Sequence, residues 1–179
     1  MERPSDTKRR ILDVARELFA EKGVQRTSLQ EIADRLGITK PALYYHFTSR
    51  DELVRSIVAP LIEEGEAFLA RHEAAGTVSP RALLEEYFDF HYRHRGQIML
   101  VFTELTTLAE LGFVELVLNW RGRLATLLVG PDPTLDQSVR AVIALGGLQD
   151  CTIQFPEVPM DDLRAAAVDG ACVTLGLAG

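Results

Sequence analysis

The stretch TSLQEIADRLGITKPALYYHFTSRDEL, from Thr27 to Leu53, decides how the chain folds, because it holds two candidate helices separated by Gly37. The first helix opens on SLQE (Ser28–Glu31), a capping-box pattern in which the serine hydroxyl and the glutamate carboxylate each accept a backbone amide of the other residue. Gly37 supplies a left-handed stop, and Pro41 falls in the first turn of the second helix, where a missing amide costs little. Two short helices joined by a three-residue turn are typical of a helix-turn-helix unit.

The second helix carries four ring-bearing residues in succession, at positions 44–47. Leu43 and Phe47 are four residues apart, so they share one face, which we expect to pack on Ile32 and Leu36 of the first helix. In a helix-turn-helix unit the first helix braces the second, which projects a row of side chains into a DNA major groove. Tyrosine hydroxyls and an imidazole suit phosphate oxygens, and small side chains allow close approach to base edges. The residues left for that surface are Thr39, Lys40, Ala42, Tyr44, Tyr45 and His46.

The rest of the chain also shows helical periodicity and no convincing strand alternation, so the sequence predicts an all-α fold. A first helix is expected from about Ser5 to Gly23. The sequence SRDE (Ser49–Glu52) is a second capping-box pattern that opens a long helix, which Pro60 should kink or divide. Further helices are expected from Pro80, after a Ser79 cap, to Gly96, and over residues 97–112, 113–130, 134–155 and 160–179, with Thr134 and Gln137 as a third capping pair.

Charge is distributed unevenly along the 179 residues, whose net charge is −7. Residues 1–50 contain ten Lys/Arg and seven Asp/Glu, whereas the remainder contains nine and nineteen. This asymmetry is a weak indication of a nucleic-acid-binding segment attached to an acidic domain. The charged N-terminal residues show no signal peptide, and the longest apolar run, 141–148, is too short to span a bilayer. Cys151 and Cys172 do not suggest a disulfide framework. We therefore expect a cytoplasmic protein without membrane association.

The quoted stretch resembles the DNA-binding domain of the tetracycline-repressor-like (TetR) family. The resemblance covers about the first third of the chain. It is carried by the pattern Ile-Ala-x-x-Leu-Gly-Ile-Thr at residues 32–39 and by Leu-Tyr-x-His-Phe at residues 43–47, followed by Arg50 and Glu52. The family implies a homodimer with one recognition helix per subunit and a roughly palindromic double-stranded DNA operator. It also implies a divergent all-α C-terminal domain that binds a small molecule.

Carried onto this chain, the resemblance assigns a role to each matching residue. Thr27, Ser28 and Arg50 would contact phosphate. Gln30 would reach a base edge, Thr39, Lys40 and Ala42 would face the groove, and Tyr44, Tyr45 and His46 would fix the backbone register. For two of these residues a structural role competes, because Ser28 could serve only as a cap and Tyr44 could lie partly in the core. The expected domains are 1–52 for DNA binding and 53–179 for ligand binding and dimerisation.

A ligand pocket is expected among the helices between Pro80 and Leu128, because apolar cavities with a few polar groups are the usual form of small-molecule sites. An aromatic stripe at helical spacing is more often plain core, which is the alternative for each candidate. Arg121 and Thr103 are possible polar anchors and Phe113 a possible wall. The main candidates are Phe88, His91, Tyr92, Met99, Phe102, Glu104 and Trp120.

Metal and cofactor chemistry are not expected. His91 and His94 lie one helical turn apart, but no carboxylate completes a site on that face, so we expect them to contact terminal carbonyls or solvent. No nucleophile–base arrangement or phosphate-binding loop is visible, which argues against an enzyme. The last two helices carry small and apolar residues for close helix packing, and the resemblance predicts that they pair with their copies in a homodimer. Packing within one chain is the alternative reading of the same residues.

The sequence thus favours a transcriptional regulator, a repressor released from its operator by a small-molecule ligand that shifts the population of subunit arrangements. Two other classes stay open: an α-helical enzyme that inherited the N-terminal domain, and a ligand-independent DNA-binding or scaffold protein.

Overall fold

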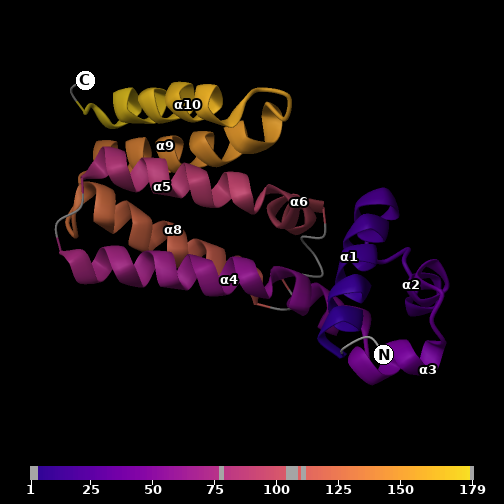
Figure 1. The fold of residues 1–179 in the computed structure, drawn as a ribbon. Helices are drawn as coiled ribbons and strands as arrows, with labels where there is room; N and C mark the ends of the chain where they lie inside the picture. Colours follow the sequence, from indigo (N-terminus) through magenta and orange to yellow (C-terminus); the bar gives the residue numbers. More distant parts are fainter. Residues whose placement is uncertain (1–3, 77–78, 104–108, 110–111, 178–179) are drawn as a thin grey trace.

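The computed structural model describes residues 4–76, 79–103, 109 and 112–177, without the side chains of residues 4, 5 and 101–103. Within these ranges it contains nine α-helices and no strand, which confirms the all-α prediction. The helices form two lobes (Figure 1). The small lobe consists of α1 (Pro4–Lys22), α2 (Leu29–Leu36) and α3 (Lys40–His46), and α4 (Arg50–Ala75) leads from it along the large lobe.

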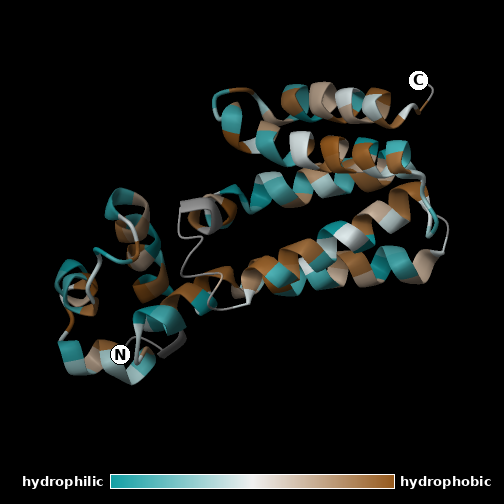
Figure 2. Cartoon of the chain, turned by 180° about the vertical axis from the view of Figure 1, so that it is seen from behind, coloured by the Kyte–Doolittle hydropathy of each residue, from teal (hydrophilic) through white to brown (hydrophobic). Residues whose placement is uncertain are grey.

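The large lobe adds five helices to α4, namely α5 (Pro80–Arg93), α6 (Arg95–Thr103), α8 (Phe113–Val129), α9 (Leu135–Gln154) and α10 (Met160–Leu175). α9 and α10 form a helical hairpin that packs on α5, and α8 lies between α9 and α4. Hydrophobic and hydrophilic residues alternate along the helices of this lobe (Figure 2). None of the helices described is long and apolar enough to cross a membrane.

Local capping signals set several helix ends as predicted, although Ser79, the expected cap of α5, forms no side-chain cap hydrogen bond. Ser28 and Glu31 form a complete capping box at α2, and Thr134 and Gln137 form another at α9. Gly37 ends α2 with φ of 68°, in the left-handed region that favours glycine.

Three predicted boundaries differ from the structure. The box at α4 is only half formed: the Ser49 hydroxyl accepts the Glu52 amide at 3.1 Å, but the Glu52 carboxylate accepts the amide and hydroxyl of Thr48 instead, at 2.7 and 2.8 Å. Pro60 does not divide α4, which is continuous, so of the two expected effects the kink stays a prediction. Gly96 does not end α5, because α5 stops at Arg93 and α6 begins at Arg95, so Gly96 lies inside a helix.

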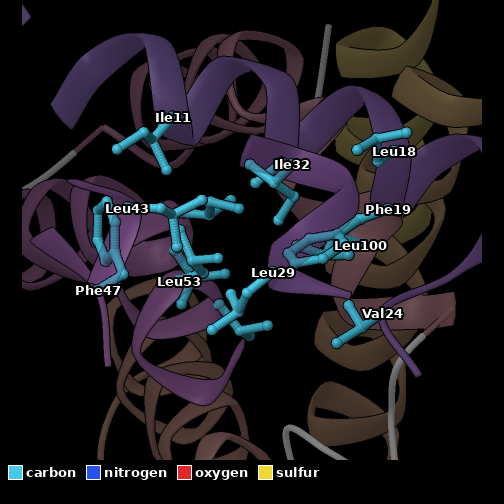
Figure 3. Close-up of a cluster of buried hydrophobic side chains, with 14 of the residues drawn as sticks. Ile11, Leu18, Phe19, Val24, Leu29, Ile32, Leu43, Phe47, Leu53 and Leu100 are labelled. Atoms are coloured by element: carbon cyan, nitrogen blue, oxygen red, sulfur yellow. The ribbon is translucent and has the colours of Figure 1, made fainter. Parts of the chain in front are cut away.

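The small lobe has its own hydrophobic core, shown in Figure 3. Leu43 and Phe47 are fully buried in the same cluster as Ile32, with Leu36 packed against it, so the predicted inner face of α3 is confirmed. α4 contributes residues 53, 54, 57 and 58 to this core. A domain boundary between residues 52 and 53 would therefore divide the cluster, and that boundary stays a prediction.

The two lobes also share contacts beyond α4. Leu100 of α6 and Phe113 of α8 belong to the small-lobe core, although both helices lie in the large lobe. Figure 3 shows Leu100 next to Phe19 of α1. A second core, built from α4, α5, α8, α9 and α10, fills the large lobe and includes Phe68, Phe88 and Leu145. The helix-turn-helix unit is therefore held to the large lobe by three separate helices.

Candidate DNA-binding surface and ligand cavity

α3 presents a row of exposed side chains opposite its buried face. Thr39 caps this helix, since its hydroxyl accepts the Ala42 amide at 3.3 Å. Tyr45 is 83% exposed, and its ring meets His46 edge-on, with centroids 5.2 Å apart. Lys40 lies next to Tyr44, with Nζ 5.6 Å from the ring centroid. Tyrosine is usually at least partly buried in a folded protein. A tyrosine that is 83% exposed within a row of exposed side chains therefore indicates a surface that contacts another molecule.

α2 lies beside this row and contributes Ser28 and Gln30, both exposed. The Ser28 hydroxyl accepts the Glu31 amide at 3.2 Å, so its capping role is present. The Gln30 side-chain amide donates to Asp34 at 2.7 Å. The Lys22 ammonium is the main cause that lowers the pKa of Glu31 to about 2, and the Ser28 amide and hydroxyl add to the effect. Glu31 is therefore an anion at neutral pH and anchors α2 to the end of α1.

Two predicted phosphate contacts are turned towards the protein. Thr27 is only 1% exposed, and its hydroxyl donates to the Gly23 carbonyl at 2.9 Å. Arg50 donates to the Gln25 carbonyl at 2.8 Å and thereby ties the start of α4 to the loop before α2. The geometry does not support a phosphate contact by the Thr27 side chain, because its hydroxyl is buried and donates to a carbonyl in the turn after α1. Arg50 is half-buried and has the same structural role in this conformation.

The large lobe contains a cavity of about 360 Å³ between α4, α5, α6, α8 and α9. Two of the predicted pocket residues, His91 and Trp120, line it, as do Phe113 and Arg121. A volume near 360 Å³ lies at the small end of the range of roughly 300–1,000 Å³ typical of ligand pockets. The apolar part of the wall comprises Leu61, Phe68, Leu69, Phe90, Ile98, Phe113, Val114, Val117, Leu118 and Leu124.

The other predicted pocket residues are not brought to this cavity. Phe88 is fully buried in the large-lobe core, and Tyr92 packs against that core. Met99 is 43% exposed and lies at a separate cavity of about 590 Å³ between α1, α4 and α6. The side chain of Phe102 and all of Glu104 lie outside the described residues.

His91 provides a neutral polar group at the wall of the cavity. Its Nδ1 is 3.0 Å from the Tyr87 carbonyl, which can only accept, so Nδ1 carries the proton and Nε2 is left as an acceptor. Burial lowers the pKa of His91 to about 4, and burial also raises the pKa of the Tyr87 hydroxyl. Both groups are therefore uncharged at neutral pH.

Gly65, which the sequence analysis did not identify, leaves the space that the Trp120 side chain occupies. The indole lies against Gly65 of α4, where an added Cβ would come within 2.4 Å of Cη2. The indole Nε1–H donates to Glu66 at 2.5 Å, and Arg123 binds both Glu66 and Glu73 at 2.7–2.8 Å. An isolated glycine inside a long helix can indicate that another side chain packs closely on the helix there. Gly65 was therefore the sequence signal from which a close contact at this point of α4 could have been predicted.

His94 does not face terminal carbonyls or solvent as expected. It is 6% exposed, and its Nε2 lies 3.0 Å from the Glu64 carboxylate, which also binds Arg93. In the part of the chain that the structure describes, no group of three His, Cys, Asp or Glu side chains could hold a metal ion.

The outer face of the α9–α10 hairpin is apolar and open. Exposed residues on α9 recur at helical spacing, namely Leu135, Val139, Val142 and Ile143. α10 adds the exposed Val173 and small exposed residues at 165, 166 and 170. Contiguous exposed apolar residues of this kind mark interaction surfaces.

Comparisons with known proteins agree with this geometry. Residues 11–57 match the family described as bacterial regulatory proteins, tetR family. The chain is 33% identical over 92 residues to the HTH-type transcriptional regulator TtgR of Pseudomonas putida, an alignment that covers 49% of this chain and 44% of that one. It is 34% identical over 91 residues to the HTH-type transcriptional activator FasR of Mycolicibacterium smegmatis, covering 49% and 42%.

The matches to these curated relatives therefore span less than half of their length. A solved structure extends the similarity over nearly the whole chain. The crystal structure of a transcriptional regulator of Aquifex aeolicus is 26% identical, covers 93% of this chain and 98% of that one, and superposes with a TM-score of 0.73. Residues 11–57 therefore contain the helix-turn-helix domain of the tetR family of bacterial regulatory proteins, and the fold of the whole chain is similar to that of a solved transcriptional regulator.

Proposed function

We propose that the chain acts as a homodimeric transcriptional repressor that leaves a palindromic DNA operator when a small molecule binds its large lobe. The observation that carries this proposal is the exposed row on α3, held over a packed helix-turn-helix core in the region of the family match. Thr39, Lys40 and Ala42 would face base edges, while Tyr44, Tyr45 and His46 would contact phosphates. Ser28 and Gln30 would extend the contact along α2. Such a protein would act in the cytoplasm, where the DNA is.

The proposed dimer forms through the apolar outer face of α9 and α10. A two-fold axis through this face would build a four-helix bundle and would place the two small lobes on one side of the dimer. The distance between the two α3 helices would then set the spacing of the operator half-sites. We further propose residues 1–52 as the DNA-binding domain and 53–179 as the ligand-binding and dimerisation domain.

The proposed release is a population shift rather than a local unfolding. A ligand in the large-lobe cavity would touch Phe113, which also belongs to the core of the small lobe. It would touch Leu61 and Gly65 of α4 as well, about one and two turns beyond the α4 residues that complete that core. α4, with Pro60 as its hinge, would carry the movement by one route, and α8, through Phe113, would carry it by the other. If a ligand weakened operator binding without changing the separation of the two α3 helices, this mechanism would be wrong.

The two alternative classes have less support. The relatives and the solved structure named above are regulators, not enzymes. A ligand-independent scaffold would not need an apolar cavity of about 360 Å³ in its large lobe. One relative is named an activator, so the direction of regulation needs its own test.

The experiment is a selection of bound duplexes from a random DNA pool at physiological salt, followed by sequencing. A palindromic consensus, with half-sites about one or two helical turns apart, is the expected result. The selected duplex, placed ahead of a reporter gene, then reports repression or activation. A folded, dimeric protein that enriches no sequence would contradict operator binding.

A further inference from the structure

We propose that the large-lobe cavity binds a compact amphipathic anion, a carboxylate with an aliphatic or aromatic body, whose charged group pairs with Arg121. As a statement about the effector, this inference rests on the proposed function. As a statement about binding, it rests only on the cavity and its charged groups.

Among the described residues that line the cavity, Arg121 is the cation that no acidic side chain pairs with. It lines the cavity from α8, is half-buried, and forms no ion pair or hydrogen bond with another described residue. Arg123, two residues further along the same helix, is held by the carboxylates of Glu66 and Glu73. A partly buried guanidinium loses hydration, and a carboxylate replaces that hydration with charge-assisted hydrogen bonds.

Gly146 of α9 makes room for this guanidinium. A Cβ at position 146 would lie 3.2 Å from Arg121 Nη2, which is tighter than ordinary van der Waals contact. The Arg121 side chain therefore lies against the α9 backbone at the wall of the cavity, where a fork of N–H donors is available to a ligand.

The electrostatic environment at this end of the cavity favours an anion over a cation. Asp150 is the acidic residue among the described lining residues, and it is exposed, so water solvates its charge. Burial is the largest cause of the raised pKa of Tyr87 and the lowered pKa of His91. The Arg121 charge lowers both pKa values, and on Tyr87 its effect is larger than the opposite effect of Asp150. Tyr87 thus experiences a net positive effect from these two charges, and His91 experiences the positive charge of Arg121.

The remainder of the wall fits an apolar body. Phe68, Phe90, Phe113 and Trp120 supply rings from three helices, and the aliphatic lining residues fill the space between them. The neutral His91 offers an acceptor that does not attract a second charge. One anionic group on a small hydrophobic body matches this combination and the modest volume of the cavity.

Trp120 makes the test direct, because it is the single tryptophan of the chain and lines the cavity. Octanoate, octanol and octylamine, which share a chain length and differ in charge, are titrated separately while tryptophan emission is followed. Octanoate should give a saturable change and bind more tightly than the other two. The variant Arg121→Gln should weaken octanoate by roughly tenfold or more, the loss expected for a charge-assisted hydrogen bond, and leave octanol unchanged. Arg55→Gln, an exposed position on α4, is the charge-matched control and should leave octanoate binding unchanged.

Several results would overturn the assignment. Equal binding of octanoate to the parent protein and to Arg121→Gln would remove Arg121 from the site. Preference for octylamine would make Asp150 the anchor, and the absence of a saturable change with any of the three probes would refute an anion site. The octanol titration and a thermal melt show that Arg121→Gln is folded. If the protein selects a DNA palindrome but does not bind octanoate, only the proposed ligand class is refuted. If it binds octanoate through Arg121 but selects no DNA sequence, only the proposed regulatory function is refuted.

Discussion

Replacing Gly65 with alanine should displace the indole of Trp120 and destabilise the large lobe. The added Cβ would lie 2.4 Å from Cη2 and 2.7 Å from Cζ3 of the ring, distances that real Cβ contacts do not reach. The ring belongs to a rigid side chain that is also tied to Glu66 through its Nε1–H. Neither the ring nor α4 can therefore move aside without loss of contacts.

The magnitude follows from two opposing effects. Glycine to alanine inside a helix normally stabilises a protein by about 0.5–1 kcal/mol. Forcing an extra carbon into a packed contact costs about 1–3 kcal/mol. Loss of a hydrogen bond to a charged acceptor, if the indole leaves Glu66, adds about 1.5–3 kcal/mol. We expect a net loss of about 1–3 kcal/mol, since the ring can keep part of its contacts.

Thermal unfolding and tryptophan emission measure this prediction together. Each kcal/mol corresponds to a fall of about 2–4 °C in Tm for a chain of this size. The emission of the single tryptophan should shift to longer wavelength as the ring meets water. Gly122→Ala is the matched control, because Gly122 is also inside a helix but an added Cβ there meets nothing within 4 Å, so it should stabilise. If Gly65→Ala had the same Tm as Gly122→Ala and unchanged tryptophan emission, the proposed packing of Trp120 on Gly65 would be refuted.

Four further predictions test the small lobe and the assembly. Thr27→Val keeps the shape of the side chain but removes the hydroxyl that donates to the Gly23 carbonyl. It should lower the free energy of unfolding by about 1–3 kcal/mol, measured by thermal unfolding, and leave operator affinity unchanged. A lower operator affinity at unchanged stability would instead support a phosphate contact by Thr27. Lys40→Ala should weaken operator binding and reduce the slope of log K against log salt by about one, measured by fluorescence anisotropy over a salt series. Glu31 has a pKa of about 2 when folded against an ordinary 4.5, so its stabilisation is present above pH 4.5 and is lost as the pH falls from 4.5 towards 2; Glu31→Gln should remove this acid dependence from the Tm. Val142→Glu should give a monomer in sedimentation velocity, and a dimer that persists would place the interface elsewhere.

Sequence reasoning succeeded mainly where the cause lies within four residues of the effect, although the local signals at Ser49, Pro60 and Gly96 did not act fully as predicted. The capping boxes at Ser28 and Thr134 and the left-handed stop at Gly37 depend only on neighbouring residues. The buried pair Leu43 and Phe47 follows from helical spacing, since two residues four apart share a face. These local signals were enough for the all-α class and for the helix-turn-helix unit.

Sequence reasoning fell short where the cause lies far along the chain. The burial of Thr27 depends on where the end of α1 comes to lie, and the contacts of Arg50 depend on the loop before α2. Trp120 packs on Gly65 of another helix, and Arg121 packs on Gly146 of another helix, so neither packing partner can be read from local sequence. Periodicity gives a helix an apolar face but does not say whether that face meets a core or a cavity, which is why aromatic candidates on one helix had different outcomes.

The contacts of Phe113 bear on how a signal would pass between the lobes. A hinge at Pro60 requires α4 to bend, yet α4 is one continuous helix whose residues before and after Pro60 are packed in two cores. Phe113 lies at the wall of the cavity and in the core of the small lobe at once, so a ligand that moves α8 acts on that core without any bend in α4. Since packed cores shift between discrete arrangements rather than deform continuously, a small displacement of this ring would favour one placement of the small lobe over another in the proposed mechanism. Coupling through α8 therefore requires fewer rearrangements than coupling through a hinge in α4.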